Sequence, residues 1–163
     1  MKLQPLTAEH ADAVLAFETR NRAYFATSIP DRGDDYFAAY PDRHAALLAM
    51  QDAGTDRFHV MVTDDGTVAA RVNLVHIEDG EAEIGYRVGQ EFTGRGVATR
   101  SVRAACDLAR TAYGLTRLHA VVTTDNPASR TVLLRNGFTP TTATVVNGRA
   151  AHSYVRPVPL MGE

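Results

Sequence analysis

The middle of the chain contains three strand-like segments separated by two short turns, and this feature restricts the fold more than any other. The segments alternate apolar and polar residues with the period of strands and cover residues 58–63, 67–77 and 81–88. Each turn contains an Asp-Gly pair, Asp65 with Gly66 and Asp79 with Gly80, which favours a tight hairpin. Because such short connections join antiparallel neighbours, the pattern predicts a three-stranded antiparallel meander.

The segments before the meander predict one strand and two helical stretches. Residues 1–6 form the expected strand, and Thr7 begins a helical pattern. The periodicity breaks over residues 21–33 and returns as a second helical stretch over about residues 34–53. Pro41 must interrupt or kink that stretch, because proline removes a backbone donor from the helix interior.

The segments after the meander alternate helices and strands. They are an amphipathic helix at 97–113, a buried-type strand at 118–123, a helix at 127–135 and a closing hairpin of 138–146 and 149–158. The 163 residues suit a single domain that covers residues 1–163. The predicted fold class is therefore α/β, with one mixed, mostly antiparallel sheet of about seven strands flanked by about four helices.

The composition excludes several classes of protein. A formal net charge of −2 leaves no basic surplus for holding a phosphate backbone, so we expect small substrates and no nucleic acid. No apolar run is long enough to span a bilayer, and residues 1–6 lack the layout of a secretory signal, so we expect a cytoplasmic protein without a membrane partner. The single cysteine, Cys106, rules out an intrachain disulfide and a multi-cysteine metal site, and we expect it in the core.

The strongest local signal is the run from Thr93 to Thr99, which lies between a strand and the long helix. Its small residues allow a ligand close to the backbone, and the unpaired amides at the start of the helix suit a phosphate, to which Arg95 could add a charged hydrogen bond. Taken alone, the run is explained equally well by a glycine turn without a ligand. It lacks the Lys-Ser/Thr ending of a triphosphatase loop, and Thr99 replaces the third glycine of a dinucleotide loop.

A second signal follows the strand at 118–123, where the chain continues into Asn126, Pro127 and Ser129. Proline suits the first position of a helix, and the residue before it suits the N-cap, so helix capping is one explanation for Asn126. Asn126 and Ser129 are three residues apart and share a face at the start of the helix. Both side chains could therefore also contact a ligand.

Four motifs together give the chain a resemblance to the GNAT superfamily of N-acetyltransferases, and within it to the ribosomal-protein N-terminal alanine or serine acetyltransferases. They are Glu-Ile-Gly-Tyr-Arg-Val at 83–88, Thr-Gly-Arg-Gly-Val-Ala-Thr at 93–99, Asn-Pro-Ala-Ser at 126–129 and Asn-Gly-Phe at 136–138. The resemblance covers nearly the whole chain. It implies acetyl-CoA as the cosubstrate, no metal, and a sheet that is splayed in the middle.

The resemblance also implies roles for individual residues. Residues of the loop would hold the coenzyme A pyrophosphate, and residues at the end of the third meander strand would hydrogen-bond the pantetheine arm, together with Asn126. The implied cofactor-binding set is Tyr86, Arg87, Val88, Thr93, Gly94, Arg95, Gly96, Val97, Ala98, Thr99, Asn126 and Ser129. Ser129 would lie near the thioester sulfur. Two departures from the family are Thr93, where the loop often begins with arginine or glutamine, and Leu133, where many relatives have a tyrosine that donates a proton.

The chemistry of acetyl transfer requires a base for the protonated amine and an acid for the leaving thiolate. We predict Glu83 as the base, because strand parity places it with Gly85 and Arg87, although a solvated or arginine-paired glutamate is the plainer reading. His76 is a weaker candidate and reads as a surface histidine at a strand end. Ser129 is the candidate acid. Backbone amides near Val88 would stabilise the oxyanion.

The acceptor is not defined by the sequence. Aromatic residues in the irregular region, Tyr24, Phe25, Tyr36 and Phe37, lie where this family shapes its acceptor site, although packing explains most of them. A protein N-terminal amine, a polyamine and an aminoglycoside all remain open as acceptors, and the sequence is compatible with a homodimer. A non-catalytic acyl-CoA-binding module is the main alternative to an enzyme, because a pyrophosphate loop reports binding and not turnover.

Overall fold

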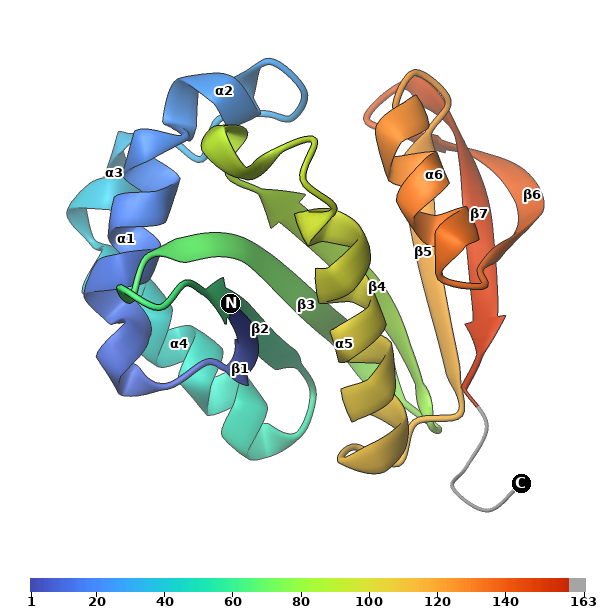
Figure 1. Ribbon diagram of the computed structural model, residues 1–163, viewed down its shortest axis with the longest axis horizontal. Coiled ribbons are helices and arrows are strands. Elements are labelled where there is room, and N and C mark those ends of the chain that lie inside the picture. Colours follow the sequence, from blue (N-terminus) through green and yellow to red (C-terminus); the bar gives the residue numbers. More distant parts are fainter. Residues whose placement is uncertain (159–163) are drawn as a thin grey trace.

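The computed structural model describes residues 1–158, which form a seven-stranded sheet in the order β1-β2-β3-β4-β5-β7-β6 (Figure 1). The strands are β1 (Lys2–Pro5), β2 (Arg57–Val62), β3 (Val68–Glu78), β4 (Glu81–Val88), β5 (Arg117–Thr123), β6 (Thr139–Val146) and β7 (Arg149–Pro157). All neighbours are antiparallel except β4 and β5, which are parallel. The predicted mixed sheet and its antiparallel meander β2-β3-β4 are confirmed.

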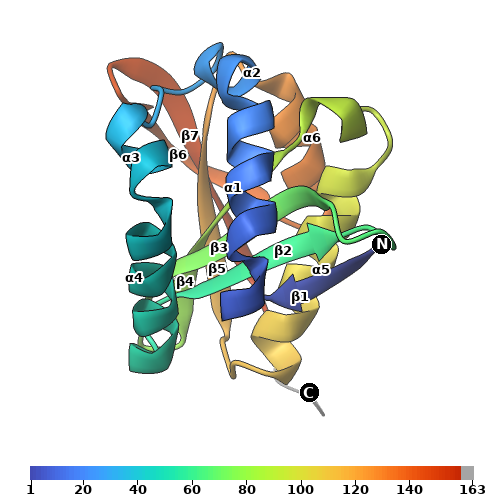
Figure 2. The ribbon, with the colours of Figure 1, turned by 90° about the vertical axis from the view of Figure 1, so that its left-hand side faces the viewer.

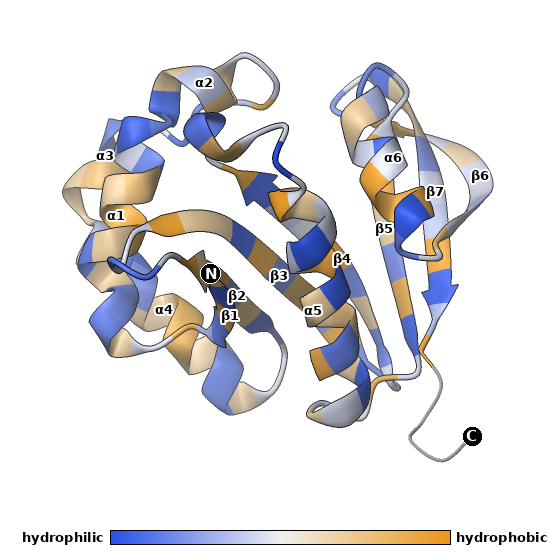
Figure 3. Cartoon of the chain, viewed as in Figure 1, coloured by the Kyte–Doolittle hydropathy of each residue, from blue (hydrophilic) through white to orange (hydrophobic). Residues whose placement is uncertain are grey.

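The described chain has six α-helices, which cover both faces of the sheet. They are α1 (Ala11–Arg20), α2 (Arg22–Ala26), α3 (Asp34–Ala38), α4 (Tyr40–Ala53), α5 (Val97–Thr111) and α6 (Pro127–Arg135). Short 3-10 turns lie at Ala8–His10 and Gln90–Phe92. Figure 2 shows α4 and α5 on opposite sides of the sheet. In Figure 3 hydrophilic and hydrophobic bands alternate along α5, as expected for an amphipathic helix.

Two differences account for the helices beyond the four that the sequence predicts. The segment expected to be irregular contains α2, which is held by the Phe25 amide donating to the Asn21 carbonyl and by the Phe25 ring, 5.5 Å from that of Phe17. The stretch at 34–53 forms two helices, because the backbone leaves helical geometry at Ala39. Pro41 lies in the first turn of α4, where its missing N–H has no intrahelical partner to lose.

The sheet opens between its two central strands. The parallel pairing of β4 with β5 covers residues 81–83 of one and 117–119 of the other, and beyond it the strands diverge (Figure 1). Each strand is held from its outer side, because β3 pairs with β4 as far as Val88 and β7 pairs with β5 as far as Thr123. The sheet is therefore splayed in the middle, as the resemblance implies.

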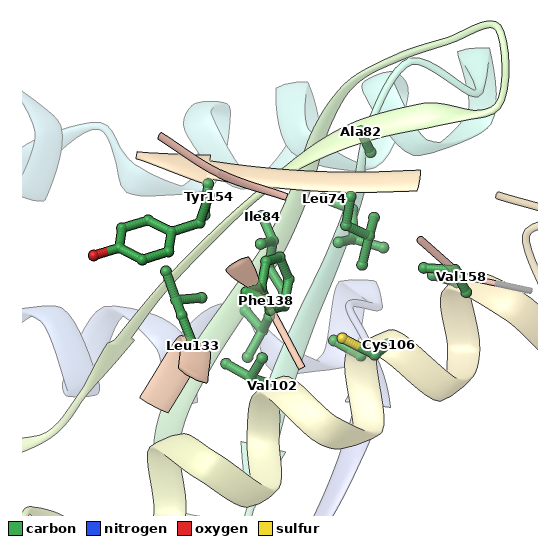
Figure 4. Packing of buried hydrophobic residues seen from close by; sticks show 14 of the residues in the cluster. Leu74, Ala82, Ile84, Val102, Cys106, Leu133, Phe138, Tyr154 and Val158 are labelled. Atoms are coloured by element: carbon green, nitrogen blue, oxygen red, sulfur yellow. The ribbon is translucent and has the colours of Figure 1, made fainter. Parts of the chain in front are cut away.

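The largest core cluster lies under α5, where Val102, Ala105, Cys106 and Ala109 share the buried face of that helix. Figure 4 shows this cluster from close by, with side chains from α5, α6 and the sheet packed together. Cys106 is 1% exposed, which confirms its expected place in the core. Full burial of a side chain the size of Val102 contributes about 1.5–3 kcal/mol to stability, so the cluster holds α5 on the sheet.

Within residues 1–158, no helix combines the length and apolar character that crossing a membrane requires. The same part of the chain contains no group of three His, Cys, Asp or Glu side chains placed to hold a metal ion.

Candidate active site

A cavity of about 490 Å³ lies between the end of β4, the start of α5 and α6. This volume is within the range of small-molecule sites. Its walls come from the end of β4, the segment from Phe92 to the first turn of α5, α6 together with its N-cap residue, and one residue of α2. The lining residues are Tyr24, Tyr86, Arg87, Val88, Phe92, Thr93, Gly94, Gly96, Val97, Ala98, Thr99, Asn126, Ala128, Ser129, Thr131, Val132 and Arg135. The structure thus gathers eleven of the twelve predicted cofactor-binding residues around one cavity.

Arg95 is the predicted residue that lies outside this wall. Its side chain is exposed, and its guanidinium carbon is 5.9 Å from the centre of the Phe92 ring. In this conformation Arg95 does not add its charge to the cavity. Its neighbours Gly94 and Gly96 do line the cavity, so the loop contributes backbone there.

The loop before α5 depends on its glycines for conformation. Gly94 and Gly96 have φ angles of 74° and 75°, a left-handed region that other residues adopt only with strain. An added Cβ at either position would meet nothing within 4 Å, so space is not the reason for glycine there. Gly96 is the N-cap of α5, and no side chain in the described structure caps that helix end. The first-turn amides at Val97 to Thr99 therefore face a cavity that suits an anion.

A chain of hydrogen bonds fixes this loop to α1. The Thr93 hydroxyl donates to the Gln90 carbonyl at 2.8 Å, and the Gln90 amide donates to Oδ1 of Asn21 at 2.9 Å. Asn21 is buried and donates from Nδ2 to the Phe17 carbonyl at 2.9 Å. Gly89 packs closely here, since a Cβ would lie 3.2 Å from both Asn21 and Phe17. This anchoring role of Asn21 was not predicted from the sequence.

Asn126 caps α6 and also lines the cavity. Its side-chain oxygen accepts a hydrogen bond from the Ser129 amide at 3.1 Å, which is the N-cap arrangement considered for this residue. The capping explanation is confirmed. Asn126 can cap the helix and contact the cavity at the same time, because the cap uses the oxygen of the carboxamide and leaves its nitrogen as a donor.

Tyr86 and Ser129 are joined by their side chains. The Tyr86 hydroxyl donates to the Ser129 carbonyl at 3.1 Å, and the two hydroxyl oxygens are 2.5 Å apart. Burial raises the pKa of Tyr86 to about 12, and the hydrogen bond to Ser129 opposes this only in part. Tyr86 is therefore protonated at neutral pH. Tyr86 is predicted to bind the cofactor, but its hydroxyl contact was not predicted, because that contact depends on how α6 is placed beside β4.

Leu133, at the position where the resemblance implies a tyrosine, lies in the core. Its side chain is buried among those of Phe138 and Val102 in the cluster that Figure 4 shows. Ser129 and Tyr86, whose hydroxyl groups are in contact, line the cavity instead.

The two base candidates lie away from the cavity wall. Glu83 is half-buried on β4 and is opposite His119 of β5 in the last register pair before the strands separate. His76 is exposed next to the irregularity in the pairing of β3 with β4, in agreement with its reading as a surface histidine. The structure therefore brings Ser129 and the loop together but places Glu83 where the strands begin to diverge.

A buried ionic cluster adjoins the cavity and was not predicted. Glu18 of α1 forms ion pairs with Arg32, Arg71 and Arg87 at N–O distances of 2.8, 3.1 and 3.1 Å. Burial by itself would raise the pKa of Glu18, but the three guanidinium charges outweigh it and lower the pKa. The sequence signal for this residue is its spacing, since it follows Val14 by four residues on the buried face of α1.

The acetyltransferase (GNAT) domain family matches residues 1–139. A probable N-acetyltransferase of Bacillus subtilis, YjcK, is 28% identical over 142 residues, which cover 83% of this chain and 78% of the relative. A ribosomal-protein alanine acetyltransferase from Vibrio fischeri superposes with a TM-score of 0.88 at 20% identity, over 96% of this chain and 92% of that chain. RimL, a ribosomal α-N-protein acetyltransferase in complex with coenzyme A, gives 0.81 at 21% identity over 96% and 93%.

The fold of these structures agrees with the resemblance found in the sequence, and the family match spans most of the chain. By this match, the chain belongs to the acetyltransferase (GNAT) domain family, whose members are acetyl-CoA-dependent acyltransferases.

Proposed function

We propose that this protein transfers the acetyl group of acetyl-CoA directly to a primary amine, either a protein N-terminal amine or the amine of a small molecule. The observation that carries the proposal is the single cavity wall that combines uncapped α5 amides with the Tyr86–Ser129 pair. The α5 amides suit the pyrophosphate of the coenzyme, and the Tyr86–Ser129 pair suits protonation of the sulfur that leaves.

Different groups of the protein bind different parts of acetyl-CoA. The amides at the start of α5 hold phosphate oxygens, and the edge of β4 from Tyr86 to Val88, which faces the opening, offers backbone hydrogen bonds to an extended amide-containing arm. The carboxamide of Asn126 adds a further contact from α6. Together these groups orient the thioester, and a fixed orientation is itself a large part of the rate enhancement.

The transfer forms one bond and breaks another. The amine nitrogen, once deprotonated, attacks the carbonyl carbon of the thioester, and the carbon–sulfur bond breaks with its electron pair on sulfur. Ser129 donates a proton to the thiolate and recovers one through the Tyr86 hydroxyl, which is protonated at neutral pH and is itself reprotonated from solvent. Glu83 accepts the amine proton through a water, because its side chain does not line the cavity. Backbone amides near Val88 stabilise the negative charge on the carbonyl oxygen.

Direct attack is favoured over an acyl-enzyme route by the position of the only cysteine. Cys106 is buried under α5 and does not line the cavity. Burial raises the pKa of its thiol, which keeps it protonated and unreactive. A covalent acetyl-cysteine step would need a thiolate within reach of the thioester, and this cysteine does not supply one.

The test is release of coenzyme A thiol from acetyl-CoA in the presence of a panel of primary amines. We expect amine-dependent release together with a matching N-acetylated product detected by mass spectrometry. Binding of acetyl-CoA without thiol release for any amine would contradict the proposal and would favour a non-catalytic acyl-CoA-binding module. Failure to bind coenzyme A at all would contradict both functions.

A further inference from the structure

The ionic cluster around Glu18 contains more positive than negative charge. Three guanidinium groups, from Arg32, Arg71 and Arg87, share one carboxylate that is only 1% exposed. The acidic residues nearest in sequence to Arg32, Asp31 and Asp34, are engaged by Arg22 through distances of 2.8 Å. The cluster therefore has two positive charges that Glu18 does not neutralise.

Structural stabilisation accounts for only one of the three arginines. Arg71 of β3 has a side chain that is 6% exposed, and its pair with Glu18 joins α1 to the sheet with equal and opposite charge. A buried carboxylate needs one such partner, and further buried cations add a desolvation cost. Arg87 and Arg32, which are 23% and 29% exposed, are surplus to this pair and lie nearer the surface.

Arg87 brings the surplus charge to the cavity. It is part of the cavity wall, and its guanidinium carbon lies 4.8 Å from the centre of the Phe25 ring, which holds the planar group in place. Burial lowers the pKa of Arg87 to about 10, with Arg32 and Arg71 adding to the lowering and Glu18 opposing it. Among the lining residues in the described chain there is no aspartate or glutamate, so the cavity itself offers Arg87 no counter-charge.

On the side of β4 to which Arg87 belongs, the space next to this residue is open. Gly85 precedes Arg87 by two residues and so shares its side of the strand, and a Cβ there would meet nothing within 4 Å. Gly85 lies beyond the last residue of β4 that pairs with β5, where the strands separate. Tyr24 of α2 also lines the cavity. An acceptor that reaches the opening from this side would pass the guanidinium group.

We propose that the acceptor amine belongs to a molecule that also carries an anionic group, a carboxylate or a phosphate, and that Arg87 binds this group with support from Arg32. The inference rests on the proposed acetyl transfer and names its substrate class. An anion would supply the counter-charge that the cluster lacks, through the paired N–H groups that guanidinium offers to such oxygens. A polycationic acceptor such as a polyamine would be repelled by the same charge.

The test compares acceptors that differ only in charge. One set consists of alanine-initiated peptides with amidated C-termini and aspartate, asparagine or lysine at the second position, and a second set consists of alanyl-alanine and its amide. The two sets separate a side-chain carboxylate from a terminal one. We expect kcat/KM to be at least about tenfold higher for the anionic member of one set than for its neutral counterpart, mainly through KM.

Arg87→Gln should reduce this preference, measured as the ratio of kcat/KM for the anionic acceptor to kcat/KM for its neutral counterpart, to less than about twofold. Arg117→Gln is the matched control, because it removes one guanidinium from an exposed pair with Glu81 outside the cavity, and it should keep the full preference. Thermal melting with and without acetyl-CoA shows whether each variant is folded and binds the coenzyme. If Arg87→Gln is too unstable to assay, Arg32→Gln should reduce the preference by about threefold.

Equal kcat/KM for anionic, neutral and cationic acceptors in the unmodified protein would overturn this inference and leave the proposed acetyl transfer intact. A preference that is undiminished in a folded Arg87→Gln or Arg32→Gln variant would also overturn it. Absence of acetylation for every acceptor in both sets, and for the broader amine panel, would instead contradict the proposed function itself.

Discussion

The hydroxyl groups of Tyr86 and Ser129 lie 2.5 Å apart and connect β4 to α6 across the opening in the sheet. The contact is possible because β4 and β5 pair over only three residues, so that the first turn of α6 comes to lie beside the free part of β4. Since burial raises the pKa of Tyr86 to about 12, the Tyr86 hydroxyl keeps its proton at neutral pH. The pair can therefore supply a proton where Leu133 cannot.

Ser129→Ala should lower kcat by about 100-fold, because it removes the proposed proton donor, and should change the affinity for acetyl-CoA much less. Tyr86→Phe should lower kcat by about tenfold, since it removes one hydrogen bond from the pair and leaves Ser129 in place. Steady-state kinetics and coenzyme titration measure the two effects separately. Ser153→Ala on β7, outside the cavity, is the control for loss of a serine hydroxyl.

One combination of results would contradict a role for Ser129 as proton donor. If Ser129→Ala keeps full turnover while Asn126→Ala loses coenzyme affinity, the start of α6 is a binding element only. The thiolate would then leave unassisted or take its proton from water.

Glu83→Gln should flatten the acid limb of the pH profile of kcat. The substitution keeps the size of the side chain and removes the proposed base, so the rate should instead follow the fraction of free amine. Glu81→Gln is the matched control, because Glu81 lies two residues earlier on β4 and forms an exposed pair with Arg117. A Glu83→Gln variant with the same rate and the same acid limb would remove Glu83 from the mechanism and leave His76 or solvent to take the proton.

Glu18→Gln should lower the free energy of unfolding by about 3–5 kcal/mol at pH 7, because it leaves buried guanidinium groups without their carboxylate. In the folded protein the pKa of Glu18 lies below its ordinary value of about 4.5, which it keeps in the unfolded chain. The contribution of Glu18 to stability is therefore fully present above pH 4.5 and is lost as the pH falls through the lower, folded pKa. The difference in free energy of unfolding between the unmodified protein and Glu18→Gln should therefore become smaller as the pH is lowered.

Urea unfolding at pH 7 and at a series of lower pH values measures this difference. Glu91→Gln removes the carboxylate of an exposed pair with Arg20 and should change stability by less than about 1 kcal/mol. A Glu18→Gln variant as stable as the unmodified protein at pH 7 would show that the cluster does not stabilise the fold.

Local signals in the sequence were sufficient for most of the fold. The Asp-Gly turns predict the meander, and the amphipathic pattern predicts α5, because hairpin geometry and helix periodicity are set by nearby residues. The helix α2 was missed because five residues rarely form a helix without tertiary support, and its support comes from Phe17 and Asn21 of the preceding segment. The break at Ala39 likewise has no local marker.

The candidate site was predictable where it depends on backbone and not where it depends on side chains from distant elements. The loop at 93–99 was found from its glycines, whose left-handed backbone the structure contains. The contact between Tyr86 and Ser129 joins residues 43 positions apart, and that between Glu18 and Arg87 joins residues 69 apart. No periodicity reports such pairs, because they arise only when the elements pack.

The central claim, that the loop before α5 holds the phosphates of acetyl-CoA, is tested most directly by thermal melting. A ligand at 100 times its Kd stabilises the folded state by about 2.7 kcal/mol, which raises Tm by about 5–10 °C for a domain of this size. Gly96→Glu and Gly96→Gln are matched in size and in strain at a φ of 75°, and they differ only in charge.

We predict that acetyl-CoA raises the Tm of the unmodified protein, raises that of Gly96→Gln by a smaller amount, and does not change that of Gly96→Glu, whose carboxylate would face the pyrophosphate. The same increase in Tm for Gly96→Glu as for the unmodified protein would contradict the account, because the phosphates would then lie elsewhere.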